Sequence, residues 1–188
     1  DLHYPLRRQR QMCIRDRNMM LYFIVKGNLL NKDFVEKRTE GFEEFLNHIN
    51  SLDIDHLANV AGVEKQLVKE AAIAYATANN SMEFHGLGVT EHEQGSKTVM
   101  LIADLAMITG NIGRRGVGVN PLRGQNNVQG AADMGCQPHQ GAGYFPVADK
   151  KIQEFYTEKY GVVHPTKAGL KIPEIFDAAI NKEVKGLW

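Results

Sequence analysis

Residues 81–96, SMEFHGLGVTEHEQGS, decide the fold class of this chain. The first five residues are typical of a short strand, and they run directly into the glycines at positions 86 and 88. Helical patterns precede this strand at residues 64–77 and follow it at residues 94–109. A strand between two helices predicts an α/β fold that is rich in helices and contains a Rossmann-like unit.

The glycines after this strand form a candidate ligand loop. In open α/β sheets, ligands bind beyond the carboxyl ends of the strands, often where the next helix begins. Residues 86–96 occupy that place, and Glu91 and His92 are polar groups that could support a ligand there. The G-x-G-x-x-G spacing of a dinucleotide site is not met, so a plain strand-to-helix turn explains the glycines equally well.

A second candidate loop is NPLRGQNNVQGAADMG at residues 120–135, which combines one arginine, several side-chain amides and three glycines. Buried amides need paired donors and acceptors, because each unpaired buried polar group costs roughly 1–3 kcal/mol. Glycines at this density weaken helices and strands alike. The composition therefore predicts a loop shaped around a polar ligand, inside a longer loop region at residues 110–143.

The charge pattern around this stretch favours an anionic ligand. No carboxylate occurs between Asp104 and Asp133, whereas Arg114, Arg115 and Arg123 all lie in that interval. Fixed guanidinium groups and closely approaching backbone amides suit phosphate, pyrophosphate or carboxylate. A solvated surface loop with incidental arginines is the alternative.

The composition of the whole chain excludes several classes of protein. Its 188 residues balance 22 basic against 22 acidic side chains, so no overall field indicates nucleic acid or a membrane surface. No apolar run approaches the ~20 residues that span a bilayer. The two cysteines, Cys13 and Cys136, show no metal-site spacing and no disulfide framework, so we expect no metal site within this chain.

Residues 1–17 differ from the rest of the chain, because they are rich in arginine and show neither helical nor strand periodicity. A basic targeting arm or a nucleic-acid-binding tail is one interpretation. However, RQRQMCIRDR at residues 8–17 resembles a recurrent translation product of sequencing-adaptor DNA. We therefore predict that residues 1–17 are a non-native segment and that the functional region is residues 18–188.

The remaining elements follow from apolar periodicity and capping residues. Residues 110–143 are expected to lack regular elements, and residues 184–188 to begin another strand. Asn31 is expected to cap a short helix that extends to residue 37. The other predicted helices lie at residues 19–26, 40–49, 55–61, 150–159 and 173–182.

Three segments together carry a family resemblance. They are GLGVTEHEQG at residues 86–95, LAMITGNIGRRGVGVNPLRGQNNVQGAADMG at residues 105–135, and the Gly-Tyr pair of GAGYFPV at residues 143–144. Residues 18–188 resemble the catalytic subunit of molybdopterin-dependent formate dehydrogenases. The broader molybdopterin oxidoreductases share the framework around TGNIGxxG, whereas PLRGQNNVQGAxDMG is characteristic of the formate enzymes.

The resemblance implies a cofactor and a substrate site. It implies two molybdopterin guanine dinucleotides that hold molybdenum or tungsten, bound by glycine-rich loops like those at residues 86–96 and 110–130. It also implies that Arg123, in the RGQNN motif, is the catalytic residue that grips the formate carboxylate. Mutual bracing of the loop is the alternative role for the amides. The implied cofactor-binding residues are Gly86, Gly88, Thr90, Glu91, Gly124, Gln125, Asn126 and Asn127.

Several parts of the family pattern are not found in residues 18–188. The family carries a four-cysteine iron–sulfur motif, and a metal-ligating cysteine or selenocysteine followed by a histidine, upstream of the region seen here. Cys136 follows the RGQNN motif, so the metal-ligand role is not assigned to it. The resemblance therefore implies an internal fragment, truncated at both ends, that alone neither holds the metal nor oxidises formate.

The predicted function is that of a formate dehydrogenase, which passes electrons from formate through an iron–sulfur cluster to a partner subunit. No contact with nucleic acid or membrane is expected. We expect a cytoplasmic location, although an export signal upstream stays open. The alternatives are another molybdopterin oxidoreductase, or a non-catalytic module that binds a nucleotide or pyrophosphate.

Overall fold

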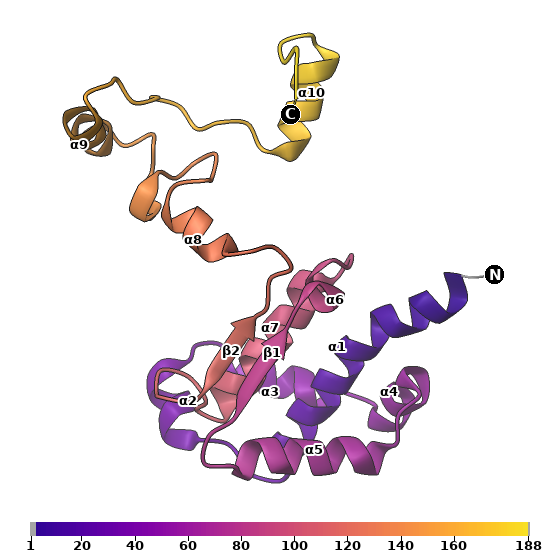
Figure 1. Ribbon diagram of the computed structural model, residues 1–188. Helices are drawn as coiled ribbons and strands as arrows, with labels where there is room; N and C mark the ends of the chain where they lie inside the picture. The colour runs from indigo at the N-terminus through magenta and orange to yellow at the C-terminus, as the bar shows by residue number, and fades with distance from the viewer. Residues whose placement is uncertain (1–2, 188) are drawn as a thin grey trace. The chain divides into compact units, whose positions relative to one another are not determined.

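A computed structural model gives the fold of residues 3–187, which form two compact units with their boundary between Gly124 and Gln125 (Figure 1). The first unit carries five helices before its first strand. They are α1 His3–Lys26, α2 Lys32–Arg38, α3 Phe42–Asn50, α4 Ile54–Ala61 and α5 Lys65–Thr77.

Helix α1 is the centre of the first unit, because it packs against α3, α4, α5 and α7. Leu21 and Ile24 of α1 are fully buried in one apolar cluster, together with Leu105 of α7. Met19, on another side of α1, is buried in a second cluster with residues of α4 and α5. The apolar segment at residues 19–25 therefore forms the buried core helix.

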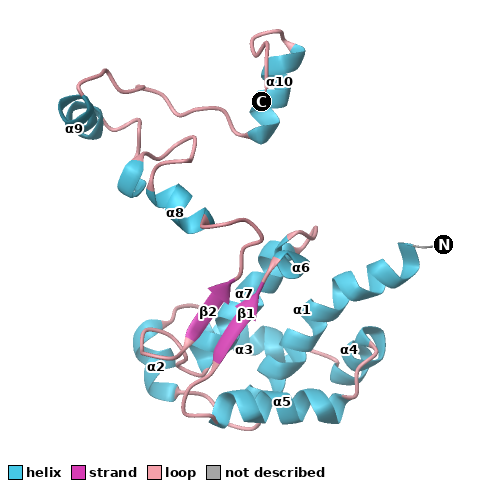
Figure 2. Ribbon diagram, in the orientation of Figure 1, coloured by secondary structure: helices cyan, strands magenta, loops and turns pink. Residues whose placement is uncertain are grey.

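The predicted α/β unit is confirmed. Strand β1, Met82–His85, leads through a short helix α6, Leu87–Thr90, into α7, Gly95–Ile108, and then into strand β2, Gly118–Pro121. The two strands pair in parallel, with Met82 opposite Gly118 and His85 opposite Pro121 (Figure 2). Both strands contact α7, as expected for a β–α–β crossover connection.

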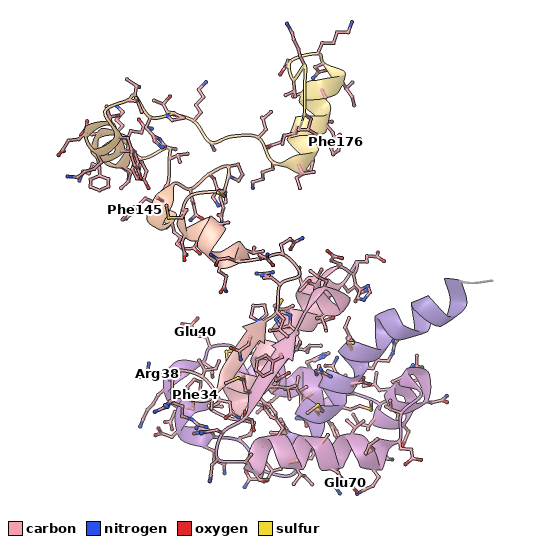
Figure 3. The ribbon with its side chains drawn as sticks, viewed as in Figure 1. Phe34, Arg38, Glu40, Glu70, Phe145 and Phe176 are labelled. Atoms are coloured by element: carbon pink, nitrogen blue, oxygen red, sulfur yellow. The ribbon has the colours of Figure 1, made fainter. Side chains whose placement is uncertain are left out.

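The second unit contains α8 Val128–Asp133, a 3₁₀ turn at Ala142–Tyr144, α9 Lys150–Tyr160 and α10 Ile172–Ile180. Its best-buried large side chain is Tyr156, which is 2% exposed and donates a hydrogen bond to the carbonyl oxygen of Ala142. Many apolar side chains of this unit are exposed. Phe145 and Phe176 are 45% and 59% exposed (Figure 3).

Most predicted helices are confirmed to within two residues at each end, and Asn31 caps α2 by accepting a hydrogen bond from the Phe34 amide. No element was predicted for residues 3–17, and the structure shows them as the first part of α1, which begins at His3. Arg, Gln, Leu and Met are strong helix formers, so this segment is helical without an amphipathic pattern. Whether residues 1–17 are native stays a prediction.

Two predictions about local structure were wrong. Residues 110–143 contain β2 and α8 rather than loop alone, because pairing with β1 and a cap at Asn127 order segments of weak intrinsic preference. Residues 184–187 form no strand, since no partner strand lies beside them in the described part of the chain. Residue 188 lies outside the described residues.

Candidate functional site

The first unit brings the two predicted ligand loops together at one edge of the sheet. Because β1 and β2 are parallel, their carboxyl ends meet at the same edge. The Leu122 amide donates a hydrogen bond of 2.6 Å to the His85 carbonyl oxygen, which extends the pairing beyond β2. Residues 86–91 and 122–124, which are more than 30 positions apart in the sequence, therefore emerge side by side.

The glycines at this edge differ in how much space surrounds them: Gly86 and Gly124 are closely packed, whereas Gly88 is open. A Cβ atom on Gly86 would lie 3.4 Å from the Leu122 carbonyl oxygen, and one on Gly124 would lie 3.4 Å from Leu87 Cδ1. A Cβ atom on Gly88 would meet no atom within 4 Å. Space beside Gly88 is therefore available for a ligand to approach the backbone.

Thr90 and Glu91 follow on the same loop. Thr90 is partly buried, and its hydroxyl lies 3.5 Å from the Gly86 carbonyl oxygen, at the limit of a hydrogen bond. Glu91 is exposed. Gly95 then holds the loop against α7, because a Cβ atom there would lie 2.3 Å from the Thr90 carbonyl oxygen.

Arg123 and Arg114 have different environments, although the acid-free composition of their stretch predicted that both could bind an anionic ligand. Arg123 is exposed at the carboxyl edge and has no hydrogen-bond or ion-pair partner among the side chains described for residues 13–187. Arg114 lies at the amino end of the sheet and donates to the Asn79 carbonyl oxygen and to the side chains of Asn80 and Asn111. Of these two arginines, Arg123 is therefore the one whose guanidinium is unengaged by the side chains that the structure describes, and it follows β2 at the carboxyl edge.

The second half of the RGQNN motif belongs to the second unit. Gln125 and Asn126 are exposed. Asn127 has a left-handed backbone with φ +47, and its Oδ1 accepts a 3.1 Å hydrogen bond from the Gly130 amide as the cap of α8. A Cβ atom on Gly130 would lie 2.3 Å from Asn127 Nδ2. The Asn127 side chain therefore braces its own loop through its oxygen.

A buried polar cluster lies on the face of β1 that carries Glu83 and His85, and sequence reasoning did not identify it. Arg17 Nε lies 3.9 Å from the Glu83 carboxylate, and burial raises the pKa of Glu83 while Arg17 opposes the shift. Burial, followed by the charge of Glu83, raises the pKa of Tyr75 above its usual range. The alternation in SMEFH, which places Glu83 and His85 on one face, was the signal available for this cluster.

The described part of the chain has neither a membrane-spanning helix nor a cluster of metal-ligating side chains. None of its helices is long and apolar enough to cross a membrane. Among the side chains placed by the structure, no three His, Cys, Asp or Glu groups converge as metal ligands.

The chain belongs to the molybdopterin oxidoreductase family, because residues 15–188 match the family model described as Molybdopterin oxidoreductase. Membership of this family implies a molybdopterin cofactor. The resemblance stated from the sequence is thus confirmed at the level of the family.

Three relatives show the breadth of the family. The chain is 42% identical over 173 residues to the F420-dependent formate dehydrogenase subunit alpha of Methanocaldococcus jannaschii, covering 91% of this chain and 25% of that protein. It is 38% identical over 189 residues to formate dehydrogenase H of Escherichia coli, covering 100% of this chain and 26% of that protein. It is 27% identical over 190 residues to the assimilatory nitrate reductase catalytic subunit of Bacillus subtilis, covering 100% of this chain and 26% of that protein. The chain spans about a quarter of the length of these curated relatives.

The carboxyl edge suits a molybdopterin cofactor on chemical grounds. Molybdopterin carries a phosphate group, and this edge offers the unengaged guanidinium of Arg123, the hydroxyl of Thr90 and open backbone beside Gly88. These are donors to an anion. The residues present therefore fit part of the binding site of such a group.

Proposed function

We propose that this chain supplies one wall of the substrate and cofactor site of a formate dehydrogenase catalytic subunit. The observation that carries the proposal is Arg123. Its exposed guanidinium is unengaged by the described side chains, and it lies between Leu122 and Gly124, which lie against the Gly86–Leu87 turn. Two of the relatives described above bear the name formate dehydrogenase, which supports this substrate over others.

Arg123 would bind the formate carboxylate through two parallel N–H···O hydrogen bonds. This grip fixes the plane of formate and directs its C–H bond away from the guanidinium. Oxidation of formate yields carbon dioxide, one proton and two electrons, and the molybdopterin-held metal supplies the two-electron chemistry when it is bound. Arg123 contributes binding and orientation, and it transfers no proton because a guanidinium stays charged.

The cofactor is proposed to be a pair of molybdopterin guanine dinucleotides with molybdenum or tungsten. Backbone at Gly86, Gly88 and Gly124 would lie close to it, with Thr90 donating to phosphate oxygens. The Glu91 carboxylate accepts hydrogen bonds only, so it suits the N–H edge of guanine rather than a phosphate. Gln125, Asn126 and the Nδ2 group of Asn127 would donate to further polar atoms of the cofactor.

The electrons are proposed to leave through an iron–sulfur cluster to a partner subunit. The name of the Methanocaldococcus relative describes it as a subunit alpha, which supports an assembly of more than one subunit. We propose a cytoplasmic location for this enzyme.

The test is made in an enzyme of the relatives' full length, in which residues 15–188 replace the aligned segment of the E. coli relative. Arg123→Lys keeps the positive charge but loses the planar fork, so formate turnover should fall by about a hundredfold or more. Metal content should stay near that of the parent, because the change removes a substrate contact. Formate oxidation with a dye acceptor and metal analysis measure the two effects.

Arg115→Lys is the matched control, since Arg115 is an exposed arginine that precedes β2, at the other end of the sheet. Turnover that survives Arg123→Lys within about threefold would refute the substrate role of Arg123. Reduction of nitrate without oxidation of formate by the parent enzyme would favour the runner-up, another molybdopterin oxidoreductase. Binding of guanosine diphosphate with neither activity would favour a non-catalytic nucleotide-binding module.

A further inference from the structure

Asn111 joins the connection after α7 to the beginning of β1. It is 1% exposed, and its Oδ1 accepts hydrogen bonds from the Ser81 amide at 3.1 Å and from Arg114 Nη2 at 2.9 Å. Its Nδ2 donates to Thr109 Oγ1 at 2.9 Å. A buried amide with both ends paired holds these segments in one arrangement, because any other arrangement leaves buried polar atoms unpaired.

Arg114 makes a second link between the same two connections. Its Nη1 donates to the Asn79 carbonyl oxygen at 2.8 Å and to Asn80 Oδ1, and its Nε lies 3.4 Å from the Gly110 carbonyl oxygen. The planar fork of a guanidinium reaches these acceptors and Asn111 at the same time, which a single ammonium does not. Asn79 and Asn80 precede β1, whereas Gly110 and Asn111 precede β2.

The strand pair needs such a constraint because it is short. Each strand has four residues, and a two-stranded pair of this length is marginal in water. A slip of β2 by one residue would move its carboxyl end by about 3.3 Å and turn its side chains to the opposite face. Arg123 follows β2 by two positions, so any slip displaces Arg123 and its neighbours Leu122 and Gly124 from the Gly86–Leu87 turn.

We propose that Asn111 and Arg114 are positioning residues that fix the register of β2 against β1, and thereby place Arg123 and Gly124 beside the Gly86–Leu87 turn. Neither residue touches the candidate site, since both lie at the amino end of the sheet. The claim about register depends only on the hydrogen bonds above. Its consequence for turnover rests on the proposed function.

Amide hydrogen exchange of the full 188-residue chain, followed by NMR, tests the register. The Leu122 amide reports it, because its hydrogen bond to the His85 carbonyl oxygen forms only in the observed pairing. Arg114→Gln should speed exchange at Leu122 by about tenfold or more, while amides of α4 keep their rates. Arg114→Lys should act in the same direction, because it keeps the charge but loses the fork.

Arg115→Gln is the control, because Arg115 is the next residue, its side chain is exposed, and the change removes the same positive charge. It should leave exchange at Leu122 unchanged. Unchanged exchange at Leu122 in both Arg114 variants would overturn the proposal, and so would an equal increase in Arg115→Gln, which would show a general effect of charge. Asn111→Leu should have the larger effect; if it unfolds the chain, the Arg114 variants still decide.

The enzyme described above gives the second measurement. Arg114→Gln should lower kcat/KM for formate by about tenfold with metal content retained, because Arg123 is displaced rather than removed. Unchanged kcat/KM alongside faster exchange would overturn the link to turnover. If Arg123→Lys has no effect while exchange at Leu122 still rises in Arg114→Gln, the proposed function fails and the positioning role stands.

Discussion

Burial governs the charge of individual acids in the first unit. Burial raises the pKa of Asp104, on α7, above its ordinary value of 3.8. It also raises the pKa of Glu83, against the opposing effect of Arg17. An acid whose pKa is raised on folding binds its proton more tightly in the folded state. Its negative charge therefore lowers the stability of the fold at neutral pH.

Replacing Asp104 by Asn should reveal this effect, because Asn has nearly the same shape and no charge. Between the ordinary pKa and the raised folded pKa, stability falls as pH rises, and the full penalty remains at pH 7. Asp104→Asn should therefore raise the melting temperature at pH 7 by roughly 2–4 °C. The gain should vanish below about pH 3.8, where both states are protonated.

Thermal melting followed by circular dichroism at pH 7 and at low pH measures this difference. Asp177→Asn, which changes an exposed acid on α10, is the control and should shift melting little at either pH. A variant of Asp104 that melts below the parent at pH 7 would contradict the interpretation.

At the scale of elements, the end of α7 decides how the chain enters β2. The Gly110 amide donates a hydrogen bond to the Met107 carbonyl oxygen, and the Asn111 amide donates one to the Ala106 carbonyl oxygen. This pair of hydrogen bonds is the Schellman motif. Gly110 has φ +68, and a Cβ atom there would lie 2.4 Å from Asn31 Nδ2. This turn therefore needs glycine both for its backbone and for its contact with the cap of α2.

Two glycine substitutions separate these requirements. Gly62, after α4, has φ +71, but a Cβ atom there would meet nothing within 4 Å. Gly62→Ala should cost about 1 kcal/mol of unfolding free energy from backbone strain alone. Gly110→Ala should cost roughly 2–4 kcal/mol, because the Asn31 side chain must also move. Urea unfolding of both variants measures the difference, and equal costs would show that Asn31 adapts freely.

At the scale of the whole molecule, the two units differ in their cores. Both apolar clusters lie within residues 1–124. Among the described residues 125–187 the buried apolar side chains are Val147, Tyr156 and Ala178, while the stripe of Ile172, Phe176 and Ile180 on α10 is exposed. The first unit therefore has far more apolar burial to stabilise its fold.

Separating the units should show this difference directly. Residues 1–124 alone should unfold cooperatively in urea, with a midpoint close to that of the main transition of the whole chain. Residues 125–188 alone should show no cooperative transition and should bind a hydrophobic dye, because so few of their apolar side chains are buried. A sharp transition from the second piece would contradict this view, and circular dichroism with dye fluorescence distinguishes the outcomes.

The sequence by itself determined the helices with continuous apolar faces, the strand at residues 81–85 and the two glycine loops. These features depend on local periodicity, capping and backbone freedom, which neighbouring residues supply. It also indicated the family, through motifs that lie between residues 86 and 144, and it singled out Arg123.

Only the tertiary structure decided which arginine is available and how the loops meet. Arg114 and Arg123 occur in the same acid-free stretch, but Arg114 donates hydrogen bonds to Asn79 and Asn80, more than 30 positions away, whereas Arg123 has no partner among the described side chains. Strand β2 likewise exists through pairing with β1, since its Gly and Pro residues favour no strand by themselves. Contacts between distant segments carry no local signal in one sequence, so register and availability emerge only when the chain is folded.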